Sequence, residues 1–228
     1  MTSLRVLSAG AAKGLVGSVA PEVEGVFSAV GAIREIFEGG ALCDVLILTA
    51  RQLEELAASG RVRPETVAPI GTVRTAVAVL SGSPVPPIAT GNDLAAALRA
   101  ASAVFIPDPH KSTAGIHVRR VIDALGLADA VAPKLRAFAN GETAMRTLAE
   151  EAPAGGIGLT QTTEILYTKG LTLVGPLPPE HDLSTVYAAC VSATATSPEA
   201  SRLVQLLTGP ASAALRERSG FEAVERHP

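Results

Sequence analysis

The sequence is poor in aromatic residues, contains no tryptophan and has only two cysteines. Aromatic residues make up 3% of the 228 residues, so the core must be built from alanine, valine, leucine and isoleucine. Hydrophobic residues reach 47%, which is enough for a sizeable core. Cys43 and Cys190 each lie in an apolar run, and we interpret them as free, buried thiols.

Charge is also scarce, and its two signs are mixed along the chain. Charged residues account for 18% of the sequence, the net charge is -3, and no run of like charges occurs. Proteins that bind nucleic acid usually carry a basic patch, so we exclude a nucleic-acid partner. An anion bound by this chain must therefore be held by local geometry.

Long apolar runs and secretion signals are missing as well. No run reaches the roughly 18 residues of a membrane-spanning helix, so no membrane insertion is predicted. The apolar segment at residues 4–9 is too short for a signal peptide and follows no basic leader. The sequence as written predicts a cytoplasmic protein, and a periplasmic one if a leader has been trimmed.

Motifs for metal, nucleotide and acyl-transfer chemistry are not found. His110 and His117 are seven residues apart, with no cysteine or glutamate at metal-ligand spacing. The Gly10–Gly14 segment does not match a dinucleotide-binding loop, and neither a P-loop nor a nucleophile elbow occurs. We therefore predict no metal and no cofactor, and we interpret His117 as structural.

Short apolar runs alternate with longer helical patterns, which is typical of βαβ units and a largely parallel sheet. The predicted strands cover residues 4–8, 26–29, 44–49, 73–80, 104–106, 156–160, 171–174 and 185–191. The predicted helices cover 12–19, 33–37, 50–59, 93–101, 113–125, 142–151 and 198–218, with Asn92 or Asp93 as one cap and Asn140 as another.

The order of these elements indicates an α/β protein made of two units, one inserted in the other. The first predicted lobe is discontinuous and holds residues 1–71 and 182–228, and the second holds residues 72–181. Strands at 73–80 and 185–191 would link the two lobes.

Four segments resemble the molybdate-type solute-binding proteins of ABC transporters. They read VLSAGAAKGLV, FSAVGAIREIFEGGALCDVLILT, FIPDPHKSTAGIHVRRVIDALGL and GPASAALRERSGF, and they extend over nearly the whole chain. The resemblance implies a two-lobed type II periplasmic-binding-protein fold, with mainly parallel sheets and a central ligand cleft. It also implies a small anion as ligand and an ABC permease as a possible partner.

The sequence departs from this family where the family grips its oxyanion with serine hydroxyls. The corresponding positions here are Ala11-Ala12 and Ala29-Val30-Gly31. Because a buried oxyanion needs hydrogen-bond donors, this departure argues against molybdate. Alanine and glycine leave room for a larger ligand, so a small organic di- or tricarboxylate is preferred.

Polar and basic residues near strand ends complete the predicted ligand site. Lys13, His110 and Lys111 lie at helix starts, where a bound anion would offset their unfavourable position; alternatively, they point to solvent. Ser112 and Thr113 are interpreted as helix caps that can also touch a ligand. Thr160 and Gln161 follow a strand at the edge where open α/β sheets bind ligands.

Two functions remain open at this point. In the first, the protein is a solute-binding protein that delivers an anion to a permease. In the second, it is a cytoplasmic isomerase on the same fold, similar to aconitate isomerase, in which His110 moves a proton in an unsaturated carboxylate. The composition permits a monomer or a weak dimer.

Overall fold

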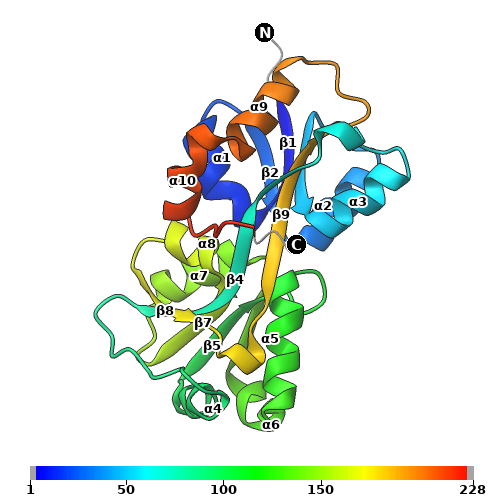
Figure 1. The fold of residues 1–228 in the computed structure, drawn as a ribbon. Helices are drawn as coiled ribbons and strands as arrows, with labels where there is room; N and C mark the ends of the chain where they lie inside the picture. Colours follow the sequence, from blue (N-terminus) through cyan, green and yellow to red (C-terminus); the bar gives the residue numbers. More distant parts are fainter. Residues whose placement is uncertain (1–3, 225–228) are drawn as a thin grey trace. The chain divides into compact units, whose positions relative to one another are not determined.

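The computed structural model of the chain describes residues 4–224 (Figure 1). Its contacts divide the chain into two compact units. Unit 1 comprises Met1–Val73 and Thr185–Pro228, and unit 2 comprises Arg74–Ser184. Two strands, β4 (Ala68–Leu80) and β9 (Ser184–Val191), contain the points at which the chain passes from one unit to the other.

The sheet of unit 1 has the strand order β2-β1-β3-β9-β4. β1 pairs in parallel with both β2 and β3, whereas β3 pairs with β9 in the antiparallel sense. The first three strands are β1 (Arg5–Ala9), β2 (Glu24–Ser28) and β3 (Val45–Thr49). The predominantly parallel pairing of β1, β2 and β3 requires a crossover helix after each of the first two strands.

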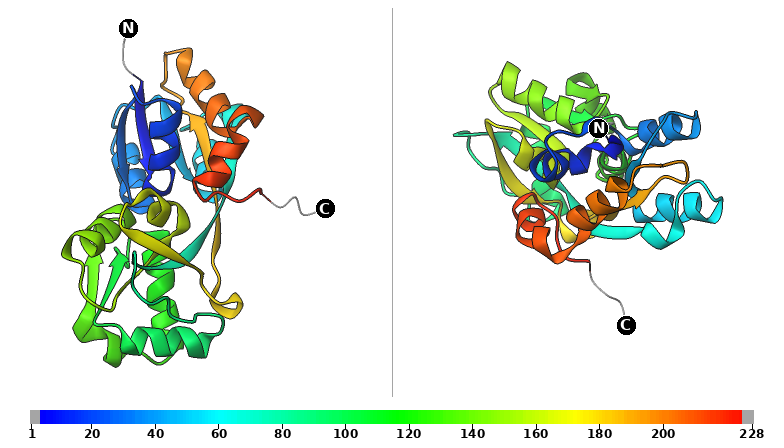
Figure 2. Two further views of the ribbon diagram at one scale, coloured as in Figure 1. Left: turned by 90° about the vertical axis from the view of Figure 1, so that its left-hand side faces the viewer. Right: turned by 90° about the horizontal axis from the view of Figure 1, so that it is seen from above.

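Helices cover both faces of the unit 1 sheet, as the strand order requires. The chain moves from β1 to β2 in one direction and from β2 past β1 to β3 in the other, so right-handed crossovers place α1 and α2 on opposite faces. α9 packs against α1, and α3 lies near α2 (Figure 1). Figure 2 shows α9 and α10 following each other on one side of this unit. The helices are α1 (Lys13–Val19), α2 (Val30–Glu38), α3 (Ala50–Ala58), α9 (Glu199–Thr208) and α10 (Ala213–Arg218).

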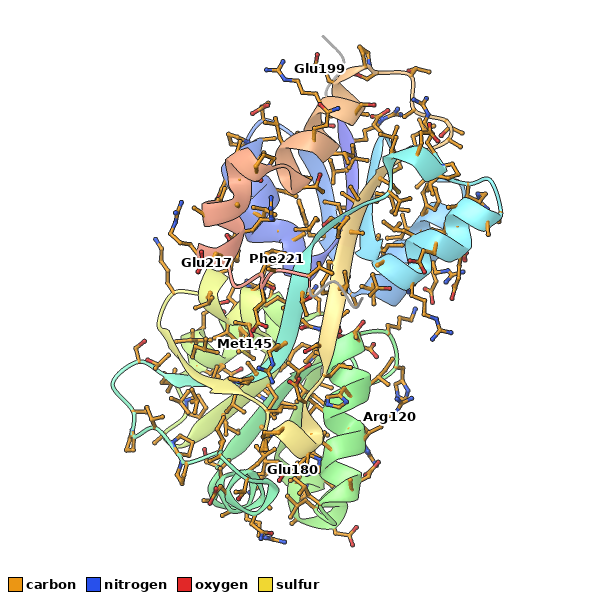
Figure 3. The ribbon with its side chains drawn as sticks, viewed as in Figure 1. Arg120, Met145, Glu180, Glu199, Glu217 and Phe221 are labelled. Atoms are coloured by element: carbon orange, nitrogen blue, oxygen red, sulfur yellow. The ribbon has the colours of Figure 1, made fainter. Side chains whose placement is uncertain are left out.

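A half-buried ion pair and an aromatic residue near the C-terminus stabilise unit 1. The Asp44 carboxylate accepts hydrogen bonds from the backbone N–H of Arg5 at 2.9 Å and from its Nε at 3.1 Å. Burial raises the pKa of Asp44, but the bonds from Arg5 lower it further, so the net pKa is below the usual value. Phe221, labelled in Figure 3, packs on Gly71, and the neighbouring Glu222 pairs with Thr72 of β4.

Both cysteines are free and lie in the core of unit 1, as the sequence predicted. Burial raises the pKa of Cys43 to about 12 and that of Cys190 further still. A thiol in such surroundings is a weak nucleophile, so these residues act as small apolar groups in the packing.

The sheet of unit 2 repeats this plan with the strand order β4-β7-β5-β6, and β8 pairs with β4. β5 pairs in parallel with β6 and β7, and the same crossover argument places α5 and α7 on opposite faces. The strands are β5 (Ala103–Pro107), β6 (Leu135–Phe138), β7 (Gly156–Gln161) and β8 (Leu171–Pro176). The helices are α4 (Gly91–Ala100), α5 (Thr113–Ala124), α6 (Ala128–Val131), α7 (Gly141–Glu151) and α8 (Thr162–Tyr167).

Small residues bring the unit 2 helices close to the sheet. Met145 of α7, labelled in Figure 3, packs against Gly158 of β7 so tightly that a Cβ there would lie 2.5 Å from the Met145 Cε. The residues that α7 covers form one apolar cluster, and those that α4 and α5 cover form another. The alternation along β7 divides its side chains between these two clusters.

Some details of the predicted secondary structure are wrong. α4 is capped by Thr90, whose side chain and Asp93 form a capping box, so neither Asn92 nor Asp93 is the cap. The predicted helix at 198–218 is two helices, because Gly209 and Pro210 interrupt it. The short elements β6, α6 and α8 were not predicted. The Asn140 cap of α7 is confirmed by its bond to the Thr143 N–H at 2.8 Å.

Candidate functional site

Unit 1 brings two groups of predicted site residues to the carboxyl edge of its sheet. Ala9 at the end of β1 is in register with Ser28 at the end of β2. Residues 11–13 follow β1 after a single residue, and residues 29–31 follow β2 directly. Both predicted segments therefore begin at one edge of one sheet, where open α/β folds bind their ligands.

Among the predicted site residues at this edge, Lys13 is the one with a polar side chain. Ala11, Ala12, Ala29 and Val30 are buried, and neither α1 nor α2 has a side-chain cap. The backbone N–H groups of the first turn of α2 are thus left for water or a ligand. The Lys13 Nζ lies 5.9 Å from the centre of the Phe27 ring, a contact that places the ammonium beside β2.

Unit 2 gathers the ends of three strands, β5, β6 and β7, and the starts of three helices, α5, α7 and α8, at its own carboxyl edge. Pro107 of β5 is in register with Phe138 of β6, and continuation of the β5–β7 register places Thr160 beside Pro107. The predicted residues His110, Lys111, Ser112 and Thr113 follow β5, and the predicted Thr160 and Gln161 end β7. The strand register thus places the predicted unit 2 residues at a common edge, together with the start of α7.

The turn between β5 and α5 is held by Asp108. Its carboxylate accepts the backbone N–H of His110 at 2.7 Å and of Lys111 at 3.1 Å. The side chains of both residues are exposed. Ser112 is the cap of α5, and its hydroxyl accepts the Gly115 N–H at 3.4 Å. Asp108 therefore orders this turn through the backbone, and its described bonds do not orient the His110 ring.

Gly115 allows the first turn of α5 to lie directly on the end of β5. A Cβ at this position would lie 2.5 Å from the Pro107 carbonyl oxygen and closer still to that of Asp108. Only glycine fits this approach, because backbone atoms surround the missing side chain. The N-terminus of α5 is therefore fixed at the edge of the sheet.

Gln161 has the most informative side chain at the unit 2 edge. It is 3% exposed, and neither its Oε1 nor its Nε2 has a hydrogen-bond partner. The hydroxyls of Thr75 and Thr163 are also buried without partners. Buried polar atoms are nearly always hydrogen-bonded, so unpartnered atoms at a strand edge indicate a place that a ligand or water fills.

Glu164 is a further residue of this edge, and the sequence analysis did not identify it. Its carboxylate accepts a hydrogen bond from the Thr160 hydroxyl at 2.5 Å and from the backbone N–H groups of Gln161 and Glu142. Gly141, at the start of α7, makes room for this carboxylate. Burial raises the pKa of Glu164 from 4.5 to about 7, and the nearby Glu142 adds to the rise. A carboxyl group with this pKa can hold or release a proton near neutral pH.

Within residues 4–224, no group of three or more histidine, cysteine, aspartate or glutamate side chains could hold a metal ion. The same part of the chain contains no helix that is both long enough and apolar enough to span a bilayer.

Two α/β units, one inserted in the other, with helix starts gathered at the carboxyl edge of each sheet, define a protein of the type II periplasmic-binding-protein fold. The family model for bacterial extracellular solute-binding proteins matches residues 11–222, and the chain belongs to this family.

Comparisons with individual proteins support this assignment. The periplasmic molybdate-binding protein of Azotobacter vinelandii superimposes with a TM-score of 0.76 at 17% identity, over 98% of this chain and 100% of that one. The sulfate-binding protein SubI of Mycobacterium tuberculosis gives 0.72 at 16% identity, over 99% and 88%. An aconitate isomerase from Pseudomonas sp is 26% identical over 246 aligned positions, which cover 100% of this chain and 90% of that enzyme. The predicted resemblance and fold class are confirmed.

Proposed function

We propose that the protein binds a small organic carboxylate at the edges described above. The observation that carries the proposal is the buried, unpartnered Gln161 amide, which lies at the carboxyl edge of unit 2 beside the start of α8. Together with the first turn of α5, it supplies hydrogen-bond donors of the kind that suit an anion at the carboxyl edge of unit 2.

A carboxylate suits these residues better than a metal oxyanion. Positions 11, 12 and 29 at the edge of unit 1 are alanine, so these three positions supply no hydroxyl donors. Lys13 can still balance one negative charge at this edge, and a carboxylate at the end of a carbon chain needs only a few donors. The similarity to an aconitate isomerase supports a carboxylate, since aconitate is a tricarboxylate.

We infer that a carrier of this kind passes its ligand to an ABC permease, as the family resemblance suggests. Among residues 4–224 the protein has no membrane-spanning helix of its own, so transport would require such a partner. A solute-binding role needs tight, reversible binding and no chemical change in the ligand.

Calorimetric titration tests the carboxylate proposal. Citrate, malate and malonate are expected to bind, whereas molybdate and sulfate are not. Lys13→Met should weaken carboxylate binding about tenfold, because a hydrogen bond to a charged group contributes about 1.5–3 kcal/mol. The matched control is Lys169→Met at an exposed lysine of unit 2, which should leave the affinity unchanged. Binding of molybdate or sulfate in place of the carboxylates would contradict the proposal.

An isomerase is the second candidate, and Glu164 is the specific observation that favours it. In a 1,3-proton shift, a base breaks a C–H bond next to the double bond of an unsaturated carboxylate. The electron pair moves through the allylic system, and the proton is returned to the far carbon. Glu164 is buried with a pKa of about 7, whereas His110, the predicted base, is exposed on the turn before α5.

Proton NMR of cis- and trans-aconitate in heavy water distinguishes the carrier from the isomerase. If the protein is an isomerase, deuterium enters the allylic position and the isomers interconvert; if it is a carrier, the ligand signals broaden without exchange. Glu164→Gln should abolish exchange if Glu164 is the base, and His110→Ala should abolish it if His110 is. If wild-type protein leaves both aconitates unexchanged while binding them, the isomerase proposal is wrong.

A further inference from the structure

The unpartnered side-chain atoms of Thr75 and Gln161 lie on one face of the unit 2 sheet, whereas the unpartnered Thr163 hydroxyl belongs to α8. Thr75 on β4 stands directly opposite Gln161 on β7, so their side chains project from the same face. This face continues through Val77 and Leu159 into the cluster that α4 and α5 cover. Thr160 projects from the other face and has Glu164 as its partner. The unpartnered atoms of Thr75 and Gln161 therefore lie on one side of the sheet, and the Thr160–Glu164 hydrogen bond lies on the other.

No neighbouring backbone group relieves this deficit. Gln161 is the cap residue of α8, but its side chain makes no capping bond. The backbone of Thr75 is already used, because its N–H donates to the Leu183 oxygen at 3.1 Å and its oxygen accepts from Leu177 at 3.0 Å. The side-chain polar atoms of Thr75 and Gln161 are left unpaired, and each such buried atom destabilises the ligand-free protein.

The chemistry of the Gln161 amide restricts the group that can complete it. Nε2 donates and needs an acceptor, which a carboxylate oxygen supplies. Oε1 only accepts and needs a donor, which an ionised carboxylate does not have. A hydroxyl group does both, since it donates to Oε1 while it accepts from Nε2 or from a threonine hydroxyl.

We propose that the face formed by Thr75 and Gln161 binds a hydroxyl group of the ligand, so that the protein selects hydroxycarboxylates over carboxylates without a hydroxyl group. This inference rests on the proposed function, because it assumes that the ligand is a carboxylate. It adds the requirement for a second functional group and names the residues that recognise it.

Pairs of acids that differ only in one hydroxyl group test the inference by calorimetry. The pairs are citrate with propane-1,2,3-tricarboxylate, and malate with succinate. Wild-type protein is expected to bind the hydroxy acid of at least one pair about tenfold or more tightly, because a site built for a hydroxyl leaves its polar groups unpaired when the hydroxyl is missing.

Gln161→Met removes the amide with little change in volume and should bring this ratio close to one, mainly through weaker binding of the hydroxy acid. Thr75→Val provides a second, independent test of the same face and should reduce the ratio as well. Gln205→Met makes the same chemical change at an exposed residue of α9 and should leave the ratio unchanged. Ligand-free Gln161→Met should also unfold at a higher temperature than the wild type, which shows that the variant is folded.

The outcomes separate this inference from the proposed function. Equal affinity for both members of each pair, or a preference for the hydroxy acid that survives Gln161→Met, would overturn the hydroxyl proposal alone. If no acid of either pair binds, the proposed function fails and the hydroxyl proposal fails with it. A preference that disappears in Gln161→Met and persists in Gln205→Met would establish both.

Discussion

Gly115→Ala is expected to lower the free energy of unfolding by about 3 kcal/mol, at the upper end of the usual cost of overpacking. The new Cβ would lie 2.7 Å from the Asp108 carbonyl carbon and 2.5 Å from the Pro107 oxygen. Because both obstacles are backbone atoms, the first turn of α5 has to move away from β5. Chemical denaturation measures the loss, and calorimetric titration with any ligand that the wild type binds should show weaker binding.

Gly17→Ala is the matched control. Gly17 lies in α1, and a Cβ there would meet nothing within 4 Å. Alanine is the better helix former, so this variant should be more stable than the wild type by about 0.5–1 kcal/mol. If Gly115→Ala is as stable as the wild type, the close approach of α5 to β5 is not required for folding.

The free energy of unfolding is expected to fall by about 3 kcal/mol as the pH rises through the interval from 4.5 to 7, owing to Glu164 alone. The folded protein keeps this carboxyl group protonated up to a pH of about 7, whereas the unfolded chain releases the proton near 4.5. Over this interval the folded state binds more protons, so a rising pH favours unfolding. Above pH 7 both states are ionised and the full cost of the buried charge is present.

Comparison with Glu164→Gln isolates this contribution from the other titrating groups. The amide resembles the protonated carboxyl group at every pH, so the variant should match the wild type near pH 4 and exceed its stability near pH 8. The contribution of Asp44 to the free energy of unfolding changes with pH in the opposite direction. Because its pKa is lowered in the folded state, this contribution is lost as the pH falls. A difference between wild type and variant that does not change with pH would show that Glu164 does not keep its proton in the folded state.

The sequence predicted well those features of the fold that depend on local patterns. The apolar run at Val45–Thr49, the Asn140 cap and the glycine stop after α2 are all local signals, and the corresponding elements form. The prediction of a single helix at 198–218 was wrong because it continued the helix through Gly209 and Pro210, which favour a break. β6 and α8 were missed because they are only a few residues long and follow other elements almost directly.

The candidate site shows the same division between local and distant information. The position of Gln161 at the end of a strand could be read from the sequence, but the absence of partners for its amide depends on β4, which is distant along the chain. Glu164 reads as an ordinary glutamate in a short helix, and its burial comes from Gly141 and Thr160. The ligand roles predicted for Lys13, His110 and Lys111 stay predictions.

The insertion of unit 2 has a consequence for how the chain acquires its structure during biosynthesis. β9 lies between β3 and β4 in the sheet of unit 1, yet the ribosome makes it last of the three. The intervening unit, Arg74–Ser184, takes roughly ten seconds to synthesise at about 5–20 residues per second. During that time β3 has no β9 with which to pair, so its apolar edge stays open while the strands of unit 2 are being made. The nascent chain is therefore most vulnerable to aggregation in its earliest segment, and the strand that ends this vulnerability is among the last to leave the ribosome.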